Sequence, residues 1–478
     1  MEKKMKDFEE SALQLIRKYQ IPGTAIGLAI KGEKVYEKGF GFRNIRKNLP
    51  VTSDTIFGVA SITKSFVCVA IMQLQEKGLL KVHDPVVEYL PDFHIKAEGI
   101  DKITIHHLMT HSAGIPPLPT LFYAGRRSRE NDPAVADYPG LDFESGEDKE
   151  SIETYEQLLE FIGEHNFELL GEPGSEFSYS NDSYALLGMI IDKVSGKPFE
   201  KYLKENIFDP AGMKHTYVLV EDLQEAENIT TLYSKRKTDD GDSVYEAPIW
   251  WSSPAMLGAG SIKSCVNDML RYADIYRTYG KVKDAQILTE NSVKAMIEPY
   301  IECSPGKYYG YGLMITPNYY GGTLVEHGGN SKAIASQFVV IPERDVTGVT
   351  FTNLAGVPAT TIMGGSLNVL EGRDFNDLPF QGDKYKYTKE ELKQYEGKYV
   401  SNEGMSLKVA EKDEKLTFKI SDDDAPIIAT NLDKDLFLIV VRDQVEVVKF
   451  IWEDGKVNRV SYHHRQLRLV DKGVEQKS

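Results

Sequence analysis

The last hundred residues of the chain differ in character from everything before them. From about residue 375, a polar, Pro-containing connector leads into short β-branched and aromatic runs, which turn pairs such as Asp454–Gly455 separate. There are about eight such runs, too short and too closely spaced to leave room for helices between them. They are YEGKYV, MSLKVAE, KLTFKI, APIIATN, DLFLIVV, VEVVKFIW, VNRVSYHH and QLRLV. This pattern predicts a small antiparallel barrel over 389–478, preceded by a linker at 373–388.

Residues 1–372 show a different organisation, with strands at both ends and helices between them. Apolar runs punctuated by glycine at 23–42 and 308–352 predict antiparallel strands. Helical periodicity recurs between these regions, at 61–77, 183–196 and 267–280. We therefore predict an α+β domain in which one antiparallel sheet is flanked by helices and its N- and C-terminal parts meet. A helical subdomain is inserted at about 65–220.

Charge and cysteine usage exclude several classes of function. The 478-residue chain has a formal net charge of −16, which argues against nucleic acid or an anionic membrane as a partner. No stretch approaches the roughly 20 apolar residues that cross a bilayer, and the first 20 residues follow helical spacing instead of a signal-peptide pattern. The three cysteines, Cys68, Cys265 and Cys303, are far apart and lack metal-ligand spacing. We expect a cytoplasmic protein without a metal or other cofactor.

The segment 117–150 is rich in Pro, Gly, Asp and Arg and has little periodicity. A loop of this length inside a domain is often functional, for example as the wall of a pocket or a lid. Disorder or an oligomer contact explains the same composition equally well.

A serine and a lysine three residues apart stand where the first long helix of this region begins. The phrase SITK, Ser61 to Lys64, is one of three Ser-x-x-Lys matches, the others being at Ser234 and Ser304. Only the first precedes an apolar helical run, in which residues three apart share a face. The free N–H groups at a helix start would also stabilise an oxyanion. The alternative is an N-cap serine with a solvated lysine.

Two further polar clusters follow in the chain. SYSNDS places Tyr179 and Asn181 in a turn before a helix, where a phenol can relay protons and an amide can hold a substrate carbonyl; the alternative is that Asn181 or Asp182 caps the helix. VEHGGNS places His327 before Gly328 and Gly329 at a strand, where glycines permit close approach of a substrate backbone. A His-Gly-Gly sequence on its own is more often a turn than a site.

Taken in order, the three clusters form a pattern of Ser-x-x-Lys, a polar triplet and a Gly-containing strand, which is the pattern of penicillin-recognising serine enzymes. The chain resembles the class C β-lactamase and D-Ala-D-Ala-peptidase superfamily over roughly residues 10–370. The phrases KVHDPVVEYLPDF, ITIHHLMTHSAGIP, IFDPAGMKHTYV and LGAGSIKSCVNDMLRYA support the resemblance. With its C-terminal barrel, the chain looks most like the self-compartmentalising CubicO peptidases.

This resemblance implies a fold and a mechanism. It implies that the barrel is lipocalin-like, that the protein forms a homo-oligomer, an octamer in that group, and that small peptides with D-amino acids are the substrates. Ser61 would be the nucleophile of an acyl-enzyme, and Lys64 and Tyr179 would relay its proton, in an order that the sequence leaves open. The N–H groups of Ser61 and Asn330 would form the oxyanion hole. Asn181 would hold the substrate amide beside Gly328 and Gly329, and His327 would hydrogen-bond toward Tyr179 or the substrate end.

One departure from the family pattern affects the choice of substrate. His327 stands where β-lactamases carry lysine, and histidine is mostly neutral at pH 7. Peptide hydrolysis is therefore favoured over β-lactam hydrolysis, although an esterase or a weak β-lactamase on the same scaffold remains an alternative. A non-catalytic scaffold with a small-ligand-binding barrel is an alternative of another class. His107, His111, His463 and His464 are assigned no site; the first two are expected to make structural hydrogen bonds, and the last two to alternate along a barrel strand.

Overall fold

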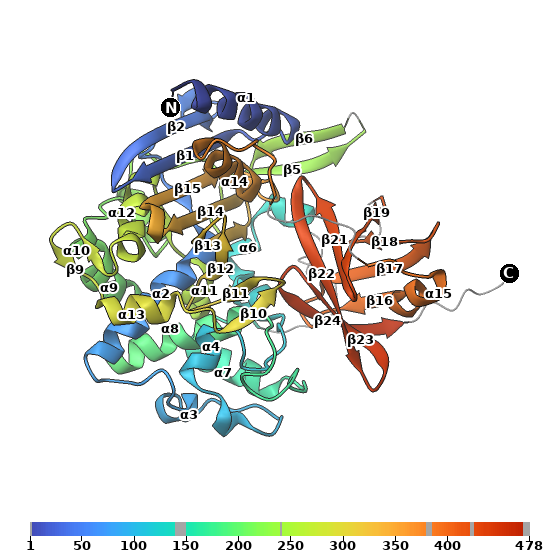
Figure 1. The fold of residues 1–478 in the computed structure, drawn as a ribbon. Helices are drawn as coiled ribbons and strands as arrows, with labels where there is room; N and C mark the ends of the chain where they lie inside the picture. Colours follow the sequence, from blue (N-terminus) through green and yellow to red (C-terminus); the bar gives the residue numbers. More distant parts are fainter. Residues whose placement is uncertain (1, 139–149, 240, 379–384, 421–424, 472–478) are drawn as a thin grey trace.

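Two nine-stranded antiparallel sheets organise the chain, one in the N-terminal three quarters and one in the C-terminal quarter (Figure 1). The computed structural model describes residues 2–138, 150–239, 241–378, 385–420 and 425–471. Parts of the predicted lid segment (139–149), of the linker (379–384) and of the barrel (421–424 and 472–478) lie outside the described residues.

The first sheet joins strands from both ends of the N-terminal region, as the sequence predicts. Strand β1 pairs with β2 on one side and with β15 on the other, in the register Thr24 opposite Thr352 and Ile30 opposite Val346. The order across the sheet is β10 (Ile301–Ser304), β11 (Lys307–Tyr309), β12 (Met314–Tyr319), β13 (Gly322–Ser331), β14 (Ile334–Ile341), β15 (Val346–Thr352), β1 (Gly23–Ile30), β2 (Glu33–Asn44) and β3 (Leu49–Pro50). The prediction of one sheet with a helical insertion is confirmed.

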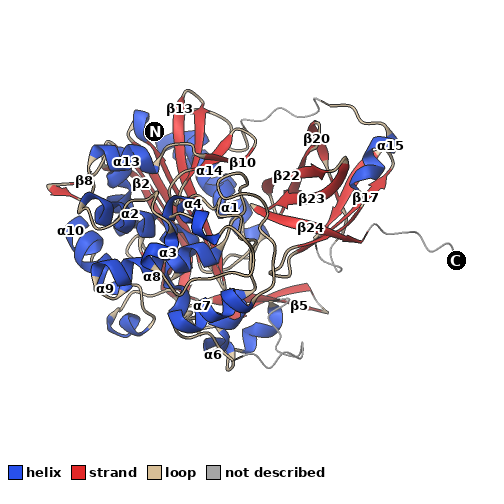
Figure 2. Ribbon diagram, turned by 90° about the horizontal axis from the view of Figure 1, so that it is seen from below, coloured by secondary structure: helices blue, strands red, loops and turns tan. Residues whose placement is uncertain are grey.

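Helices cover both faces of this sheet (Figure 2). On one face, α1 (Glu2–Lys18) buries Phe8, Ala12 and Ile16 against α14 (Ala359–Leu370) and the sheet. On the other face, α12 (Val266–Arg277) packs on β1, β14 and β15 and leads into the large helical core. The first helix therefore belongs to the folded domain, as its apolar spacing predicts.

The inserted helical region is built around two long buried helices, α2 (Thr63–Glu76) and α8 (Asn181–Ser195), which pack on one another. The other helices and 3₁₀ or π turns of the domain are η1 (Ala60–Ile62), α3 (Val86–Tyr89), η2 (Ile100–Lys102), α4 (Ile105–Met109), α7 (Tyr155–Glu164), α9 (Phe199–Leu203), η4 (Lys204–Phe208), α10 (Asp209–Ala211), η5 (Glu221–Glu225), η6 (Pro254–Met256), α11 (Leu257–Gly260), α13 (Glu290–Met296) and η7 (Pro342–Arg344). Three two-stranded ribbons complete it: β4 (Phe57–Gly58) with β7 (Lys263–Ser264), β5 (Tyr233–Thr238) with β6 (Gly241–Glu246), and β8 (Lys281–Val282) with β9 (Ala285–Gln286).

The segment predicted as a long loop at 117–150 contains regular structure in its described part. It forms α5 (Thr120–Ala124), α6 (Arg126–Arg129) and the 3₁₀ turn η3 (Pro133–Asp137). Each element is only four or five residues long, which is too short to produce a visible apolar period. The loop prediction was therefore wrong for residues 120–137.

The second sheet curls into a nearly closed barrel with its own apolar core, which includes Tyr399, Phe437 and Phe450 (Figure 1). After α15 (Lys389–Leu392) and η8 (Lys393–Tyr395) come β16 (Gly397–Val400), β17 (Ser406–Lys412), β18 (Lys415–Lys419), β19 (Ile427–Ile428), β20 (Thr430–Asp433), β21 (Leu436–Val441), β22 (Gln444–Glu453), β23 (Lys456–Tyr462) and β24 (Arg465–Asp471). The barrel is confirmed, but the run APIIATN, expected as one strand, is split into β19 and β20. These two strands pair with different neighbours at the two ends of the sheet, so the run crosses the seam of the barrel.

Two hairpin turns of the barrel touch the first domain. The β21–β22 turn carries Asp443, whose carboxylate accepts hydrogen bonds from Lys18, the last residue of α1, at 2.6 Å and from the Tyr19 hydroxyl at 2.9 Å. The main-chain carbonyl of Asp443 accepts a hydrogen bond from Thr361 of α14. The β23–β24 turn reaches the helical region, where the carbonyl of His464 accepts the N–H of Tyr179 at 2.9 Å. No helix in the described part of the chain is long and apolar enough to cross a bilayer.

Candidate active site

Ser61 and Lys64 lie at the junction of η1 and α2, with their side chains on one face. The Lys64 Nζ lies 3.3 Å from Ser61 Oγ and donates to Asn181 Oδ1 at 2.9 Å and to the carbonyl of Ala259 at 2.6 Å. The helix starts at Thr63, two residues later than the serine, so Ser61 itself belongs to the preceding 3₁₀ turn. The sequence-predicted neighbours Ser61, Lys64 and Asn181 therefore meet in one cluster.

The turn that carries Ser61 has an unusual backbone and is held from several sides. Ala60 has φ = 48°, a left-handed conformation that is rare for a residue with a side chain. The N–H of Val59 donates to Ile262, and the carbonyl of Val59 accepts from the Ser336 hydroxyl of β14, both at 2.9 Å. These bonds fix the direction of the Ser61 side chain.

The amine of Lys64 is completely buried, and its three hydrogen-bond partners are all neutral, so that two can accept its N–H groups while the Ser61 hydroxyl faces its lone pair. Burial lowers the pKa of Lys64 well below its usual value, and the positive charge of Arg465 lowers it further. Without a carboxylate against it, the amine is held toward its neutral form, in which it has a lone pair to accept a proton. A neutral amine at 3.3 Å is suited to serve as the base for the Ser61 hydroxyl.

Tyr179 lies over Lys64 from the strand-like segment before α8. Its ring centroid is 4.8 Å from Lys64 Nζ, and its hydroxyl is buried without a hydrogen-bond partner among the described atoms. Burial raises the pKa of Tyr179, while the nearby Ser61 hydroxyl and Arg465 lower it. The phenol is therefore protonated at rest and is placed to exchange a proton with the Ser61–Lys64 pair.

The cap of α8 is Ser180, whose hydroxyl accepts the N–H of Ser183 at 3.3 Å. The alternative in which Asn181 or Asp182 caps this helix is therefore wrong. Asn181 is instead the first residue of α8 and accepts a hydrogen bond from Lys64. Asp182 is buried and accepts from the Thr120 hydroxyl of α5.

Strand β13 passes beside the serine, and Gly329 is the point of closest approach. A Cβ at Gly329 would lie 2.2 Å from the carbonyl of Val59 and 3.1 Å from the Cβ of Ala60, so only glycine fits there. β13 pairs with β14 as far as Ser331, but with β12 only as far as Glu326. On the β12 side, the described strands leave the main chain of 327–331 open, with Gly328 and Asn330 on this free stretch.

His327 is near the cluster but directed elsewhere. One ring nitrogen, Nδ1, lies 2.6 Å from the carbonyl of Gly328 and therefore donates to it, so Nε2 accepts from the Tyr309 hydroxyl at 3.0 Å. The centroids of the His327 and Tyr179 rings are 6.2 Å apart. Burial lowers the pKa of His327 to about 3, which keeps it neutral. Of the two partners expected for His327, Tyr179 is replaced by Tyr309, and a contact with the substrate end stays a prediction.

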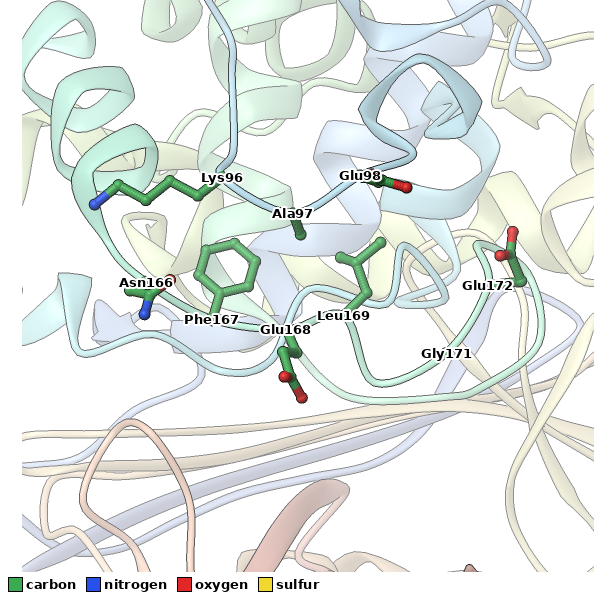
Figure 3. Close-up of a pocket in the computed structure, with 9 residues that line it drawn as sticks. All are labelled: Lys96, Ala97, Glu98, Asn166, Phe167, Glu168, Leu169, Gly171 and Glu172. Carbon is green, nitrogen blue, oxygen red and sulfur yellow. The ribbon is translucent and has the colours of Figure 1, made fainter.

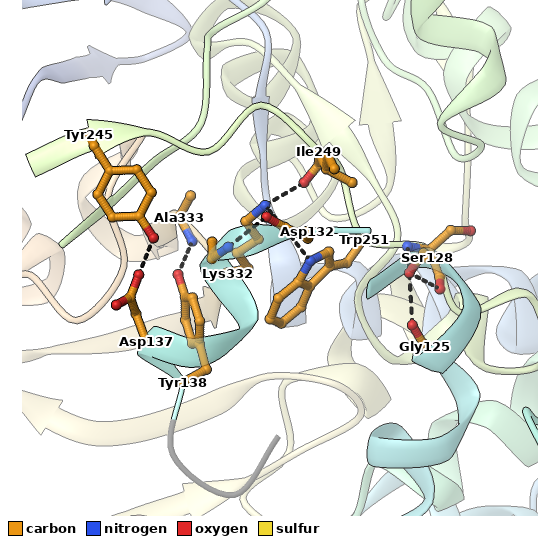
Figure 4. Close-up of polar contacts among 12 residues, drawn as sticks. Gly125, Ser128, Asp132, Asp137, Tyr138, Tyr245, Ile249, Trp251, Lys332 and Ala333 are labelled. Atoms are coloured by element: carbon orange, nitrogen blue, oxygen red, sulfur yellow. Dashed lines mark hydrogen bonds and ion pairs between the residues drawn. The ribbon is translucent and has the colours of Figure 1, made fainter. Parts of the chain in front are cut away.

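A buried ion pair fixes the turn that follows Asn330 (Figure 4). Lys332, with a side chain 2% exposed, pairs with the fully buried Asp132 of the 117–150 segment. The indole N–H of Trp251 donates to the same carboxylate at 2.7 Å, and Lys332 also donates to the carbonyl of Ile249 at 2.7 Å. The segment that the sequence analysis considered as a pocket wall thus holds the end of β13 in place.

The barrel contributes to this site, which the sequence analysis did not foresee. His463 and His464 do not alternate along a strand; both have positive φ, 48° and 65°, and form the two-residue turn between β23 and β24. The guanidinium of Arg465 lies 5.0 Å from the centre of the Tyr179 ring and is ion-paired with Glu403. The predicted alternation of His463 and His464 along a strand was therefore wrong, and the turn was missed because a His-His pair lacks the Asn-Gly signature of such turns.

Two further residues of the cluster lie outside the three polar motifs of the sequence. His111, just after α4, stacks on Tyr179 with ring centroids 4.1 Å apart and accepts the N–H of Ser180 on Nδ1 at 3.1 Å. Tyr309 of β11 is one of 26 tyrosines and is recognisable only from its contact with His327. His107 is turned away and accepts the N–H of Thr104 at the start of α4, a structural role as expected.

Two surface hollows lie near this cluster but hold none of its predicted catalytic residues. The first, of about 490 Å³, lies between residues 96–98 and 166–172 and is lined partly by glutamates (Figure 3). The second, of about 520 Å³, lies between the first domain and the barrel, with Phe177, Cys303 and Trp452 among its walls. Within the described residues, no group of three or more His, Cys, Asp or Glu is arranged to hold a metal ion.

An antiparallel sheet with helices on both faces, and a serine beside a buried lysine at the free stretch of β13, define a serine hydrolase of the β-lactamase type. Residues 2–363 match the beta-lactamase family model, and the chain belongs to this family.

Individual relatives match most of the chain. Penicillin-binding protein 4* of Bacillus subtilis (strain 168) is 24% identical over 84% of this chain and 85% of its own length. The octameric penicillin-binding protein homologue from Pyrococcus abyssi is 29% identical, with a TM-score of 0.68, and covers 97% of this chain and 99% of its own. A D-stereospecific amidohydrolase from Streptomyces sp. is 23% identical with a TM-score of 0.56, covers 74% of this chain and 94% of its own, and shares the fold.

Proposed function

We propose that this protein is a serine peptidase that hydrolyses small peptides, including peptides with D-amino acids, through an acyl-enzyme on Ser61. The observation that carries the proposal is the buried Lys64 amine, whose acceptors are neutral and which contacts Ser61 Oγ at 3.3 Å. A lysine in a structural role normally reaches solvent or a carboxylate. This one is desolvated beside a hydroxyl, where a depressed pKa makes it a base.

In the proposed reaction, Ser61 Oγ attacks the scissile carbonyl and its proton passes to Lys64. The oxyanion is bound by the N–H groups of Ser61 and Asn330. Tyr179 passes a proton to the leaving amine as the C–N bond breaks, and the proton that Lys64 took from Ser61 replaces it on Tyr179, so the acyl group stays on Ser61 with both proton carriers restored. Water then attacks the ester, and the acid product leaves as Ser61 regains its proton. Lys64 is favoured as the first base, because it contacts Ser61 Oγ directly.

The substrate assignment rests on the free edge of β13 and on His327. An extended peptide can align along the open main chain of 327–331, with the Asn181 amide near its carbonyl. Because the pKa of His327 is lowered to about 3, it brings no positive charge to the position where β-lactamases carry lysine. This favours peptides over β-lactams. The fold shared with a D-stereospecific amidohydrolase supports D-residues in the substrate.

The decisive test compares hydrolysis by the wild type and Ser61→Ala on matched D- and L-peptides, a p-nitrophenyl ester and a chromogenic cephalosporin. We expect cleavage of the D-peptides by the wild type, and a loss of at least about 10³-fold in kcat/KM in Ser61→Ala. Ser304→Ala, at a chance Ser-x-x-Lys match, is the control and should retain activity. Full activity in Ser61→Ala would contradict the mechanism, and a preference for the ester or the cephalosporin would replace the peptidase assignment.

A fluorophosphonate probe separates the proposal from a non-catalytic scaffold. The activated Ser61 should be labelled once per chain, and intact mass and peptide mapping should place the adduct there. A wild-type protein that stays unlabelled would favour the alternative function, a non-catalytic scaffold with a small-ligand-binding barrel.

We also propose that the protein forms a homo-oligomer. Support comes from the Pyrococcus abyssi homologue, which is described as octameric and aligns over both domains. Light scattering of the full chain should give a mass several times that of one 53.8 kDa chain, up to eightfold, and a monomeric mass would contradict the proposal.

A further inference from the structure

The barrel holds Tyr179 through both its main chain and its ring. The carbonyl of His464 accepts the N–H of Tyr179 at 2.9 Å, so the β23–β24 turn bonds to the main chain of the segment that carries the phenol. On the same turn, the Arg465 guanidinium lies 5.0 Å from the centre of the Tyr179 ring, within the range of a cation–π contact.

Arg465 is held firmly in this place. Its side chain is 16% exposed and is ion-paired with Glu403, which is 20% exposed, and its Nη1 donates to the carbonyl of His463 at 3.1 Å. The adjacent Gln466 anchors the turn by donating to Glu176 at 2.6 Å and to the carbonyl of Phe177 at 3.1 Å. A side chain so constrained acts as a fixed charge beside the phenol.

We infer that Arg465, although it belongs to the barrel, is a positioning residue of the active site that holds and polarises the Tyr179 phenol beside Lys64. This inference rests on the proposed function, because it assigns a role in the chemistry proposed for Ser61. The proposed mechanism then needs both domains, because Arg465, which lies over the Tyr179 ring, comes from the barrel.

The electrostatic consequence has a definite sign. A fixed positive charge favours the deprotonated forms of Lys64 and Tyr179, and Arg465 lowers the pKa of both, whereas Glu403 raises both. The pair titrates as one coupled unit. The ionisable groups that face the Lys64–Tyr179 pair come from both domains. They are Cys68 of α2, His111 after α4, Tyr184 of α8, Tyr309 of β11, His327 of β13, and Glu403, His464 and Arg465 of the barrel. Of these, only Glu403 and Arg465 are charged at neutral pH, because burial holds the others neutral.

The test is the pH profile of Ser61 acylation by p-nitrophenyl acetate, which has no carboxylate for Arg465 to bind. In Arg465→Gln, the acidic limb should move up by about one pH unit, so that acylation at a given pH on that limb falls by about tenfold. In Glu403→Gln, the limb should move down by a similar amount. Arg465→Lys, which keeps the charge, should lie close to the wild type if it unfolds at the same temperature.

Arg468→Gln is the matched control on the same strand, because Arg468 is 40% exposed and pairs only loosely, at 3.5 Å, with Glu168. Unshifted limbs in both Arg465→Gln and Glu403→Gln would overturn the inference while leaving acylation of Ser61 intact. A defect of Arg465→Gln confined to peptides with a free C-terminal carboxylate would also overturn it and make Arg465 a substrate anchor. No acylation of Ser61 in the wild type would instead contradict the proposed function.

Discussion

The Lys64 amine and the His111 ring beside it are both buried basic groups without a counter-ion. Lys64 bonds only to neutral oxygens, and His111 has an Nε2 without a partner among the described atoms. Such groups remain neutral in the folded protein and gain a proton on unfolding, so they make stability depend on pH. For these two residues, the lack of a counter-ion beside the nitrogen matters as much as the groups that contact it.

His111 provides a pH test that leaves the proposed catalytic residues in place. Its folded-state pKa is lowered well below 6.5, so the unfolded chain binds more protons below about pH 6.5 and stability falls as the pH decreases. In His111→Asn this loss should be smaller, by up to about 1 kcal/mol per pH unit. Asn tolerates the local φ of 56° and can accept the Ser180 N–H in place of Nδ1.

Urea unfolding of both proteins between pH 7 and pH 4.5 measures this difference. Equal pH slopes would show that His111 is already protonated in the folded state. The opposite outcome, a steeper slope for the variant, would contradict the sign worked out above.

At the scale of elements, the site depends on how closely β13 approaches the turn η1. The contact is made through Gly329, where an added Cβ would meet a main-chain oxygen that cannot rotate away. The buried Lys332–Asp132 pair holds the same end of the strand, three residues further along the chain. Both devices fix the main chain that carries the Asn330 N–H.

Gly329→Ala should therefore push β13 away from Ser61. We expect kcat/KM for peptides to fall by at least about 10²-fold, because the oxyanion hole and the nucleophile separate. Gly364→Ala in α14 is the control, since nothing lies within 4 Å of the added carbon, and it should keep full activity. If Gly329→Ala were as active as this control, the close approach would have no catalytic importance.

Elements with long apolar periods could be predicted from the sequence, and elements fixed by tertiary contacts could not. The helix after Ser61, the 23–42 hairpin and the pairing of N- and C-terminal strands follow from periodicity. The turns at 120–137 and the split of β19 from β20 depend on local geometry and barrel closure, which leave no period. Ser61, Lys64 and Asn181 lie in short motifs that can be recognised in the sequence, whereas Tyr309 and Arg465 are brought to the site only by the three-dimensional fold.

At the scale of the whole molecule, two separated turns are among the contacts that attach the barrel to the first domain. One of them bonds to α1 and α14 through Asp443, and the other bonds to Tyr179 through His464. The strand count of the barrel could be predicted to within one strand. Its placement against the site could not, because nothing in a hairpin sequence says what its turn will touch.

Deleting residues 385–478 should consequently impair the chemistry and not only the choice of substrate. The truncated protein loses the His464 bond and the Arg465 charge beside Tyr179, and we expect at least about 10²-fold lower kcat/KM on every substrate that the full chain cleaves. Circular dichroism checks that the first domain remains folded, and light scattering reports its mass. Retention of activity and of assembly size would make the barrel a passenger.

The pairing of β1 with β15 and the contact between Tyr179 and the β23–β24 turn both have a consequence for biosynthesis. Ser61 and Lys64 are synthesised early, but the adjoining sheet lacks the pairing of β1 with β15 until residue 352 has emerged, and Tyr179 lacks its barrel partner until residue 464 has. If Ser61 is the nucleophile that we propose, a nascent chain therefore cannot hydrolyse peptides before both of these segments have been made.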